Sequence, residues 1–122
     1  MSKTIIVDLD NTITIEDPSV DYSNKLPNLP LIKKLKEYKL NGFEIIVHTA
    51  RNMRSYEKDI SKINIDTLPT ILNWLNKNDV PYDGLLVGKP WCGLNGFYID
   101  DKAVRPKEFL NLTYNEILEL IK

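Results

Sequence analysis

Two carboxylates lie two residues apart near the start of the chain, in the run Asp8-Leu9-Asp10-Asn11-Thr12. Residues two apart in an extended backbone point to the same side, so Asp8 and Asp10 share a cleft if the strand continues that far. One carboxylate can then attack phosphorus, while the other protonates the leaving oxygen and later deprotonates water. The pair alone is weak evidence, because aspartate is common where a strand turns.

A carboxylate that attacks a phosphate needs cationic help, because the two groups carry charge of the same sign. Lys89, held between Gly88 and Pro90, is a candidate point charge for the phosphoryl oxygens. Thr49 offers a hydroxyl, with backbone N–H groups beside it, for a remaining oxygen. Without a role in phosphate binding, Lys89 would be a solvated lysine in a loop, and Thr49 would be a threonine that caps the end of a strand.

A second acidic pair, Asp100-Asp101, stands near the end of the chain. Together with Asp8 and the backbone carbonyl of Asp10, it supplies the hard oxygen ligands that Mg²⁺ prefers and leaves positions for water and substrate. Taken alone, the pair reads equally well as a charged turn.

The elements that must position these residues follow from the hydrophobic pattern. Short apolar runs rich in β-branched residues predict strands, and apolar residues at helical spacing predict helices. The predicted strands are Thr4–Leu9, Phe43–His48, Gly84–Val87 and Gly96–Ile99, and the predicted helices are Pro30–Leu40, Thr67–Asn78 and one that starts after Thr113. This last helix is predicted to open with a capping box of Thr113 and Glu116 and to bury Ile117, Leu118, Leu120 and Ile121. Residues 11–28 read as a loop or small hairpin, and residues 51–65 as a loop with a helical turn.

This alternation predicts an α/β fold with a mostly parallel central sheet. Ligands of such sheets bind beyond the carboxyl ends of the strands. The candidate residues each follow a predicted strand, so we expect them to meet at one edge of the sheet; they are Asp8, Asp10, Thr49, Lys89, Asp100 and Asp101.

Composition narrows the classes of function. The chain has 122 residues, 43% of them hydrophobic and 27% charged, which predicts a single domain over residues 1–122. Because 16 Lys and Arg face 17 Asp and Glu, with a net charge of −1, we expect no nucleic-acid partner. Cys92 is the one cysteine, which excludes an internal disulfide and a cysteine-based zinc cluster. The N-terminus lacks the apolar length of a signal or membrane segment, so we expect a cytoplasmic protein without a membrane partner.

The ordered set of motifs resembles the haloacid dehalogenase superfamily. Its Asp-x-Asp-x-Thr, Thr, Lys and Asp-Asp motifs correspond to Asp8-Leu9-Asp10-Asn11-Thr12, Thr49, Lys89 and Asp100-Asp101. The resemblance implies a three-layer Rossmann-like fold and a phosphatase that forms an aspartyl-phosphate. It makes Asp8 the nucleophile, Asp10 the general acid and base, and Thr49 and Lys89 the phosphate binders. It also implies Mg²⁺ held by Asp8, Asp10 and Asp100, with Asp101 behind the direct ligands or as an alternative ligand.

Too few residues separate the motifs for a large cap domain, so the chain resembles a capless member of that superfamily. The segments His48-Thr49-Ala50-Arg51, Gly88-Lys89-Pro90-Trp91 and 98–106 further resemble the short bacterial capsule-biosynthesis phosphatases. That resemblance implies a small sugar phosphate or related metabolite as substrate. Either residues 11–28 or a neighbouring subunit of a homo-oligomer would then close the site.

Three arginines follow the motifs and are candidates for binding a second anionic group of the substrate. They are Arg51, Arg54 and Arg105. For each of them, a solvated or structural arginine is the ordinary alternative.

Two other classes of protein share part of this pattern. A response-regulator receiver domain also has an α/β fold, a phosphoacceptor Asp, a Thr, a Lys and an acidic pair, but its acidic pair comes first and its Lys last. A phospholigand-binding module on the same fold would lack turnover, yet it has no need for an acid-base residue at Asp10. Phosphoacceptor signalling and binding without hydrolysis are therefore the alternatives to a phosphatase.

Overall fold

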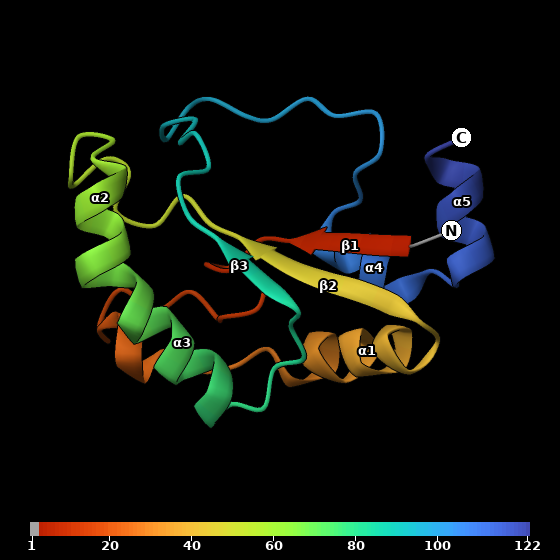
Figure 1. The fold of residues 1–122 in the computed structure, drawn as a ribbon. Coiled ribbons are helices and arrows are strands. Elements are labelled where there is room, and N and C mark those ends of the chain that lie inside the picture. The colour runs from red at the N-terminus through yellow and green to blue at the C-terminus, as the bar shows by residue number, and fades with distance from the viewer. Residues whose placement is uncertain (1–2) are drawn as a thin grey trace. The chain divides into compact units, whose positions relative to one another are not determined.

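The computed structural model describes residues 3–122 (Figure 1). The chain divides into two compact units, Met1–Trp91 and Cys92–Lys122, and each is described by itself. A single domain over residues 1–122 stays a prediction.

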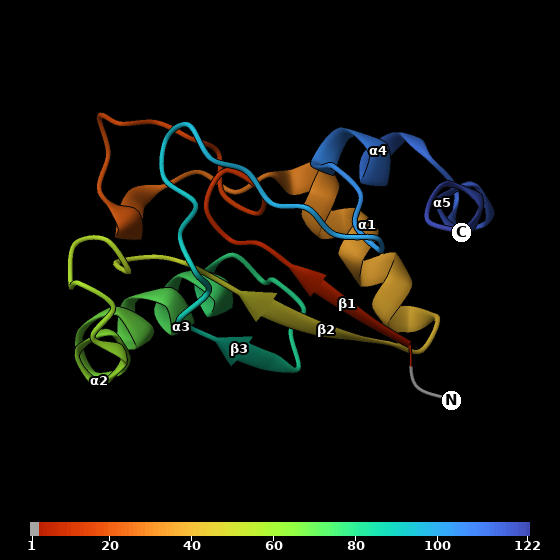
Figure 2. The same cartoon turned by 90° about the horizontal axis from the view of Figure 1, so that it is seen from above.

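The first unit is built on a three-stranded sheet of β1 (Lys3–Val7), β2 (Phe43–His48) and β3 (Gly84–Leu86). The strand order is β1-β2-β3, and both pairs are parallel (Figures 1 and 2). In this register Val7 lies beside Val47, and Val47 lies beside Leu85, so the carboxyl ends of all three strands meet at one edge. The predicted α/β fold with a parallel sheet is confirmed.

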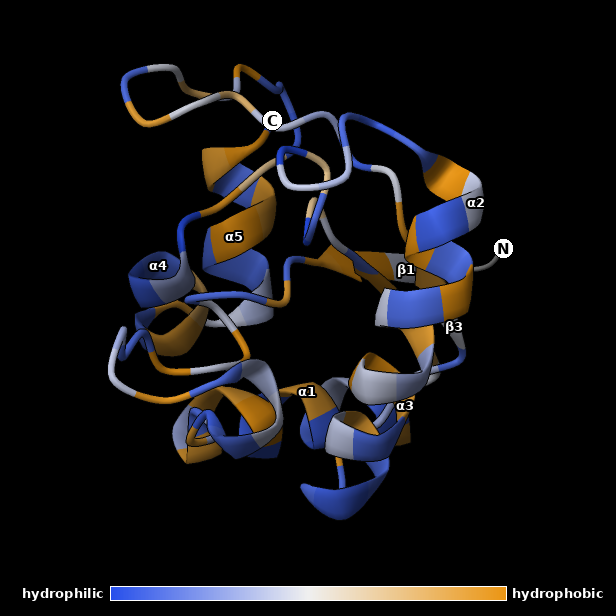
Figure 3. Cartoon of the chain, turned by 90° about the vertical axis from the view of Figure 1, so that its left-hand side faces the viewer, coloured by the Kyte–Doolittle hydropathy of each residue, from blue (hydrophilic) through white to orange (hydrophobic). Residues whose placement is uncertain are grey.

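Helices α1 (Leu29–Leu40) and α3 (Leu68–Lys77) pack on the same face of this sheet (Figure 1). Alternate residues of β2 point to that face and are buried, as the pleat requires, with Ile45 and Val47 both 0% exposed. The side chain of Asn28 caps α1, and Gly42 follows it with φ of +92°. Both helices start and end within two residues of their predicted bounds, and Figure 3 shows hydrophobic and hydrophilic residues on different sides of them.

Two short elements link β2 to α3. The chain leaves β2 through turns, enters α2 (Ile60–Lys62), and continues through a π-helical turn, Ile63–Thr67, into α3. Asp59 caps α2, because its side chain accepts the N–H of Lys62. The predicted loop with a helical turn is confirmed.

The segment between β1 and α1 is a loop that folds back on itself. Thr14 and Pro27 form an antiparallel bridge, and a 3₁₀ helix spans Tyr22–Asn24. The indole N–H of Trp74 donates to the carbonyl of Lys25 at 2.8 Å, which ties the loop to α3. This agrees with the predicted loop or small hairpin.

The opposite face of the sheet is not covered by α1 and α3. Ile6 of β1 is 66% exposed and Leu86 of β3 is 55% exposed. Within the first unit the described helices therefore make one layer on the sheet, and a three-layer arrangement remains a matter for proposal.

The second unit contains α4 (Pro106–Asn111) and α5 (Tyr114–Leu120). The predicted capping box is confirmed, because Thr113 accepts the N–H of Glu116 while the Glu116 carboxylate accepts the N–H of Thr113. Ile117 is buried, whereas Leu118 and Leu120, which the sequence predicted to be buried, are exposed.

The predicted strand Gly96–Ile99 is wrong, since these residues are irregular in the structure. Phe97 is 77% exposed and Ile99 is 89% exposed. A strand is stabilised by pairing with a neighbour, and the regular elements within Cys92–Lys122 are the two helices alone. Asp100 and Asp101 therefore follow an extended loop.

Over residues 3–122, none of the helices has both the length and the apolar character needed to cross a membrane.

Candidate active site

The backbone turns sharply just after β1, and this turn positions the first motif. The strand ends at Val7, and the carbonyl of Leu9 then accepts the N–H groups of Thr12, Ile13 and Thr14 at 3.3, 2.9 and 3.0 Å. Asn11 takes a φ of +60°, a left-handed value that asparagine tolerates well. The strand therefore does not continue to Asp10, which was the condition for the pleat to align the two carboxylates, and the turn sets the direction of the Asp10 side chain instead.

Asp8 lies half-buried at the end of β1 with two partners. Its Oδ2 accepts the hydroxyl of Thr12 at 3.0 Å, and its Oδ1 lies 3.6 Å from Nζ of Lys89. Burial raises the pKa of the Asp8 carboxyl, whereas Lys89 and the Thr12 hydroxyl act in the opposite direction. Nearby Asp10 adds a smaller repulsion that raises this pKa further. The turn has brought the two carboxylates within electrostatic range of each other.

Lys89 reaches Asp8 because its backbone extends the pairing of β2 and β3. The N–H of Thr49 donates to Leu86 O at 3.0 Å, and the N–H of Lys89 then donates to Thr49 O at 3.1 Å. Gly88 makes this possible with a φ of +84°, a left-handed value that favours glycine. Thr49 and Lys89 are thus brought together, as the shared strand edge predicts.

Thr49 lies deeper than a direct phosphate ligand would. It is 0% exposed, and its hydroxyl oxygen accepts the N–H of Arg51 at 3.0 Å. The hydroxyl hydrogen remains available for donation, but a phosphate oxygen reaches it only if neighbouring side chains move. Its role as a phosphate binder stays a prediction.

Asp10 is held by Arg51 in a forked ion pair. Nε of Arg51 donates to Oδ2 at 3.1 Å, and Nη2 donates to Oδ1 at 2.7 Å. The Arg51 side chain is only 1% exposed, while that of Asp10 is 33% exposed. The guanidinium of Arg51, which the sequence predicted to bind substrate, is therefore paired with Asp10, another candidate residue of the site.

Tyr22 covers the guanidinium from the loop between β1 and α1. The Cζ atom of Arg51 lies 4.0 Å from the centre of the Tyr22 ring. Burial raises the pKa of the Tyr22 hydroxyl, and the negative charge of Asp10 raises it further. Sequence reasoning missed both the fork and this stacking. The only available signal was the short spacing between Thr49 and Arg51, which keeps Arg51 at the same end of β2.

The remaining predicted site residues lie apart from this cluster or in the second unit. Arg54 is exposed in the turns after β2. Asp100, Asp101 and Arg105 belong to Cys92–Lys122 and are exposed there; Asp100 accepts the N–H of Lys102 at 2.9 Å, and Arg105 donates its own N–H to Glu108 at 2.8 Å. Because the second unit is described by itself, the predicted roles of these three residues stay predictions, as does that of Arg54.

A metal can be tested against the donor set of the first unit alone. In the part of the chain that the structure describes, no three His, Cys, Asp or Glu side chains gather closely enough to hold a metal ion. The first unit offers the Asp8 carboxylate and the Asp10 backbone carbonyl, which are the hard oxygens that suit Mg²⁺. The further ligand predicted from the sequence, Asp100, belongs to the second unit, and its part in a metal site stays a prediction.

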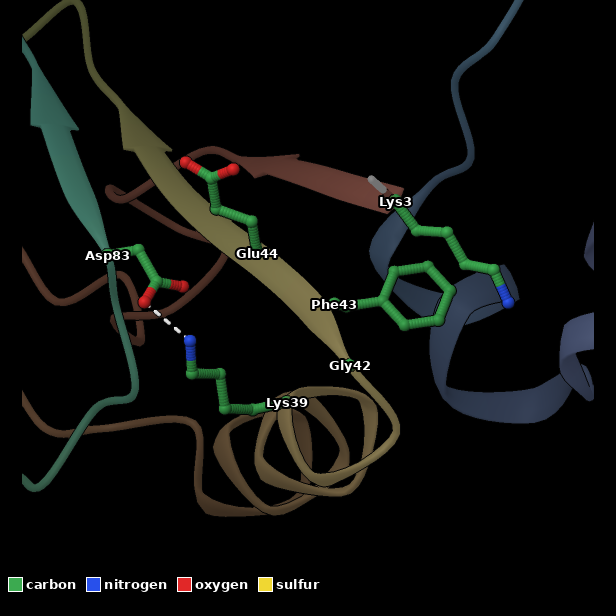
Figure 4. Close-up of a pocket in the computed structure, with 6 residues that line it drawn as sticks. All are labelled: Lys3, Lys39, Gly42, Phe43, Glu44 and Asp83. Atoms are coloured by element: carbon green, nitrogen blue, oxygen red, sulfur yellow. Dashed lines mark hydrogen bonds and ion pairs between the residues drawn. The ribbon is translucent and has the colours of Figure 1, made fainter. Parts of the chain in front are cut away.

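A hollow of about 370 Å³ lies elsewhere on the first unit and is shown in Figure 4. It is lined by Lys3, Lys39, Gly42, Phe43, Glu44 and Asp83. These residues surround the starts of β1, β2 and β3, whereas the candidate cluster follows their carboxyl ends. The hollow is therefore separate from the candidate active site.

A comparison with solved structures identifies a close relative. A crystal structure of an MCSG target from Vibrio cholerae matches with 58% sequence identity and a TM-score of 0.95, over 98% of this chain and 96% of that chain. The two proteins belong to one family. The search against family models found no match, and no curated protein matches.

A more distant match concerns the fold alone. A chain of a Pnkp1/Rnl/Hen1 complex is 23% identical with a TM-score of 0.52, over 90% of this chain but only 34% of that chain. The matched fold is therefore also found as part of a much longer chain.

Proposed function

We propose that this chain is a magnesium-dependent phosphomonoester hydrolase of the haloacid dehalogenase type, acting through an aspartyl-phosphate on Asp8. The observation that carries the proposal is the pairing of two neighbouring carboxylates with different partners. Asp8 faces a lysine ammonium 3.6 Å away, while Asp10 is gripped by an arginine fork. Two carboxylates in different environments suit two different roles, a nucleophile and an acid-base residue.

In the first half of the reaction, an Asp8 carboxylate oxygen attacks phosphorus and forms an O–P bond as the bond to the leaving oxygen breaks. Lys89 offsets the repulsion between the carboxylate and the phosphoryl oxygens. Thr12 holds the other Asp8 oxygen through its hydroxyl, which fixes the plane of the nucleophile. Protonated Asp10 gives its proton to the leaving oxygen.

In the second half, Asp10 as a carboxylate removes a proton from water, and the water oxygen attacks the same phosphorus. The Asp8 O–P bond breaks, which releases inorganic phosphate and restores the Asp8 carboxylate. The first half uses protonated Asp10 and leaves it as a carboxylate, which is the form that the second half needs. One residue can therefore serve both steps.

The proposed metal would be held by the Asp8 carboxylate, the Asp10 backbone carbonyl and Asp100. When bound, Mg²⁺ supplies positive charge that draws phosphoryl oxygens to the carboxylate and stabilises charge in the transition state. Asp101 would support these ligands without contacting the metal itself. A three-layer Rossmann-like arrangement and a cytoplasmic location belong to the same proposal.

The proposed substrate is a small sugar phosphate or related metabolite of the kind used in making capsule or surface polysaccharide. The loop between β1 and α1 supports a recognition role, because its Tyr22 stacks on the arginine that holds Asp10. Asp17 and Asp21 instead accept hydrogen bonds within the loop, from Ser19 and from Asn24, and so shape it.

A loop exchange tests this recognition role. Replacing residues 17–21 by a Gly-Ser linker keeps Tyr22 and the Thr14–Pro27 bridge, and it should raise KM for the preferred sugar phosphate far more than for an aryl phosphate. Equal changes for both substrates would show that the loop does not recognise the leaving group.

The decisive experiment on the function follows phosphate on the protein. The full chain is mixed with Mg²⁺ and a panel of sugar phosphates, nucleotides and phosphopeptides, quenched rapidly, and analysed by mass spectrometry for a hydroxylamine-sensitive phosphate on Asp8. We expect phosphate release that stops with a chelator and returns with Mg²⁺, and no adduct or turnover in Asp8→Asn.

Other outcomes separate the alternatives. A lasting phosphate on Asp8 without turnover would favour phosphoacceptor signalling. Binding without an adduct would favour a phospholigand-binding module, and normal turnover by Asp8→Asn would remove Asp8 from the nucleophile role.

A further inference from the structure

We propose that Arg51 is a positioning residue, which fixes the Asp10 carboxylate for proton transfer and is itself clamped by the ring of Tyr22. This inference rests on the proposed function, because it assigns a task to Asp10 in that reaction. It departs from the sequence prediction that made Arg51 a binder of a second anionic group.

The fork fixes the orientation of Asp10 in two directions. Two parallel N–H···O bonds, at 3.1 Å from Nε and 2.7 Å from Nη2, reach different oxygens of one carboxylate. A single bond would let the carboxylate turn about its axis, whereas a planar fork also sets its plane. One lone pair on each oxygen is used, and those that remain face away from Arg51.

The guanidinium is itself immobilised on several sides. Its side chain is 1% exposed, its face lies 4.0 Å from the Tyr22 ring centre, and its backbone N–H is bonded to the hydroxyl of Thr49. Asp10 is thus attached through Arg51 to the end of β2 and to the loop after β1. A group held from two separate elements has little freedom to drift from its bonding geometry.

One nitrogen of Arg51 shows that the arrangement is specific. Among the residues that the structure describes, buried Nη1 has no hydrogen-bond partner, although the Tyr22 ring lies against the guanidinium. Leaving a buried donor unpaired costs about 1–3 kcal/mol. A lysine at this place would bring the same charge without that donor, so charge alone does not account for the residue. The fork accounts for it.

The burial of Arg51 also argues against direct substrate binding. An anionic group of the substrate would have to displace Asp10 from both nitrogens, and the guanidinium offers it almost no accessible surface. Asp10, with a third of its side chain exposed, is the member of the pair that a leaving group can reach. Reacting groups misplaced by about 1 Å can lose on the order of 10²-fold in rate.

The test compares substrates that differ in their need for a proton. Glycerol phosphate has a poor leaving group, whose oxygen must receive a proton from Asp10. The leaving group of 2,4-dinitrophenyl phosphate is a stable phenolate, which departs without that proton. The quantity to measure is kcat/KM, because it reports phosphoryl transfer to Asp8 and excludes the later hydrolysis that both substrates share. Phosphoglycerate, an alkyl phosphate with an added carboxylate, probes a second anionic group.

We expect Arg51→Lys and Arg51→Gln to lower kcat/KM for glycerol phosphate by on the order of 10²-fold, with dinitrophenyl phosphate changing little. Asp10→Asn should show the same selectivity. Because Arg51 is buried, its variants can fail to fold, so exposed Tyr22 gives a second route. Tyr22→Ala should lower the rate for glycerol phosphate alone, and Tyr22→Phe, which keeps the ring, should match the parent.

Four results would overturn the inference. Equal losses on glycerol phosphate and dinitrophenyl phosphate would indicate a general structural role. A much larger loss on phosphoglycerate than on glycerol phosphate would make Arg51 a substrate-binding residue. If Arg51 variants do not fold, an unchanged Tyr22→Ala variant would refute the clamp. A parent that hydrolyses none of the three would overturn the proposed function as well.

Discussion

The glycine before Lys89 allows a quantitative test of how the site is built. Gly88 has a φ of +84°, and a Cβ added there would lie 2.8 Å from Cδ1 of Ile60 at the start of α2. Gly42 is a matched control, because its φ is +92° but an added Cβ meets nothing within 4 Å among the described residues. Alanine at either position adopts a left-handed backbone, which costs roughly 1–2 kcal/mol. Only alanine at position 88 also meets a neighbour.

The extra cost at position 88 is moderate, because Ile60 is 41% exposed and the contact is with the end of its flexible side chain. We expect Gly88→Ala to be less stable than Gly42→Ala by about 0.5–1 kcal/mol. Combining Gly88→Ala with Ile60→Ala should recover this difference, so a double-mutant cycle isolates the contact. Urea unfolding supplies the four free energies, provided that the slope with denaturant stays constant.

Activity gives the second reading of the same variants. Gly88→Ala displaces Lys89 and should slow phosphate release, whereas Gly42→Ala lies beside the separate hollow and should not. Since both variants lose stability, a slower rate in one alone cannot come from lower stability. The reasoning fails if the two variants are equally stable with no coupling to Ile60, or if both keep full activity.

Three further outcomes test other parts of the account. Asp10→Asn should slow turnover by about 10²–10⁴-fold while still binding Mg²⁺, and an unchanged rate would reject the acid-base role. Asp100→Ala should weaken Mg²⁺ binding in titration calorimetry far more than Asp101→Ala, because the proposed metal site uses Asp100, and not Asp101, as a direct ligand; equal affinities in both variants and the parent would contradict this. Hydrogen bonds from Lys39 and from the N–H of Ile45 lower the pKa of Asp83, so its contribution to stability is present above the ordinary aspartate value of about 3.9 and is lost as pH falls through the lower folded value. The stability gap between the parent and Asp83→Asn should therefore narrow in acid, and a gap that widens would refute the assignment.

Regular elements with a clear period could be predicted from the sequence. The apolar run Phe43–His48 and the helical spacing after Pro30 are patterns that burial produces, and the structure has a strand and a helix at these places. The capping box at Thr113 could be read directly, because its partners are three residues apart. Helix α4 was missed, although Pro106 at its first position and Glu108 in its first turn are recognised start signals.

Features that depend on distant partners could not be read in this way. Gly96–Ile99 has the composition of a strand, but pairing with a neighbour decides whether one forms. The turn after Val7 depends on one carbonyl that accepts three N–H groups. The fork between Arg51 and Asp10 joins residues 41 positions apart, and their types alone do not reveal that they meet.

The extension of strand pairing beyond β2 and β3 has a consequence for local opening. The amides of Thr49 and Lys89 are bonded within the sheet ladder, so their hydrogens should exchange with solvent only when the sheet opens. The exposed turn at Ser19 is held by the side chain of Asp17, within the loop, and can open without the sheet. Binding of a ligand beneath the loop should then slow exchange there while leaving Thr49 and Lys89 unchanged. The protein would combine a rigid reaction centre with an adjustable entrance.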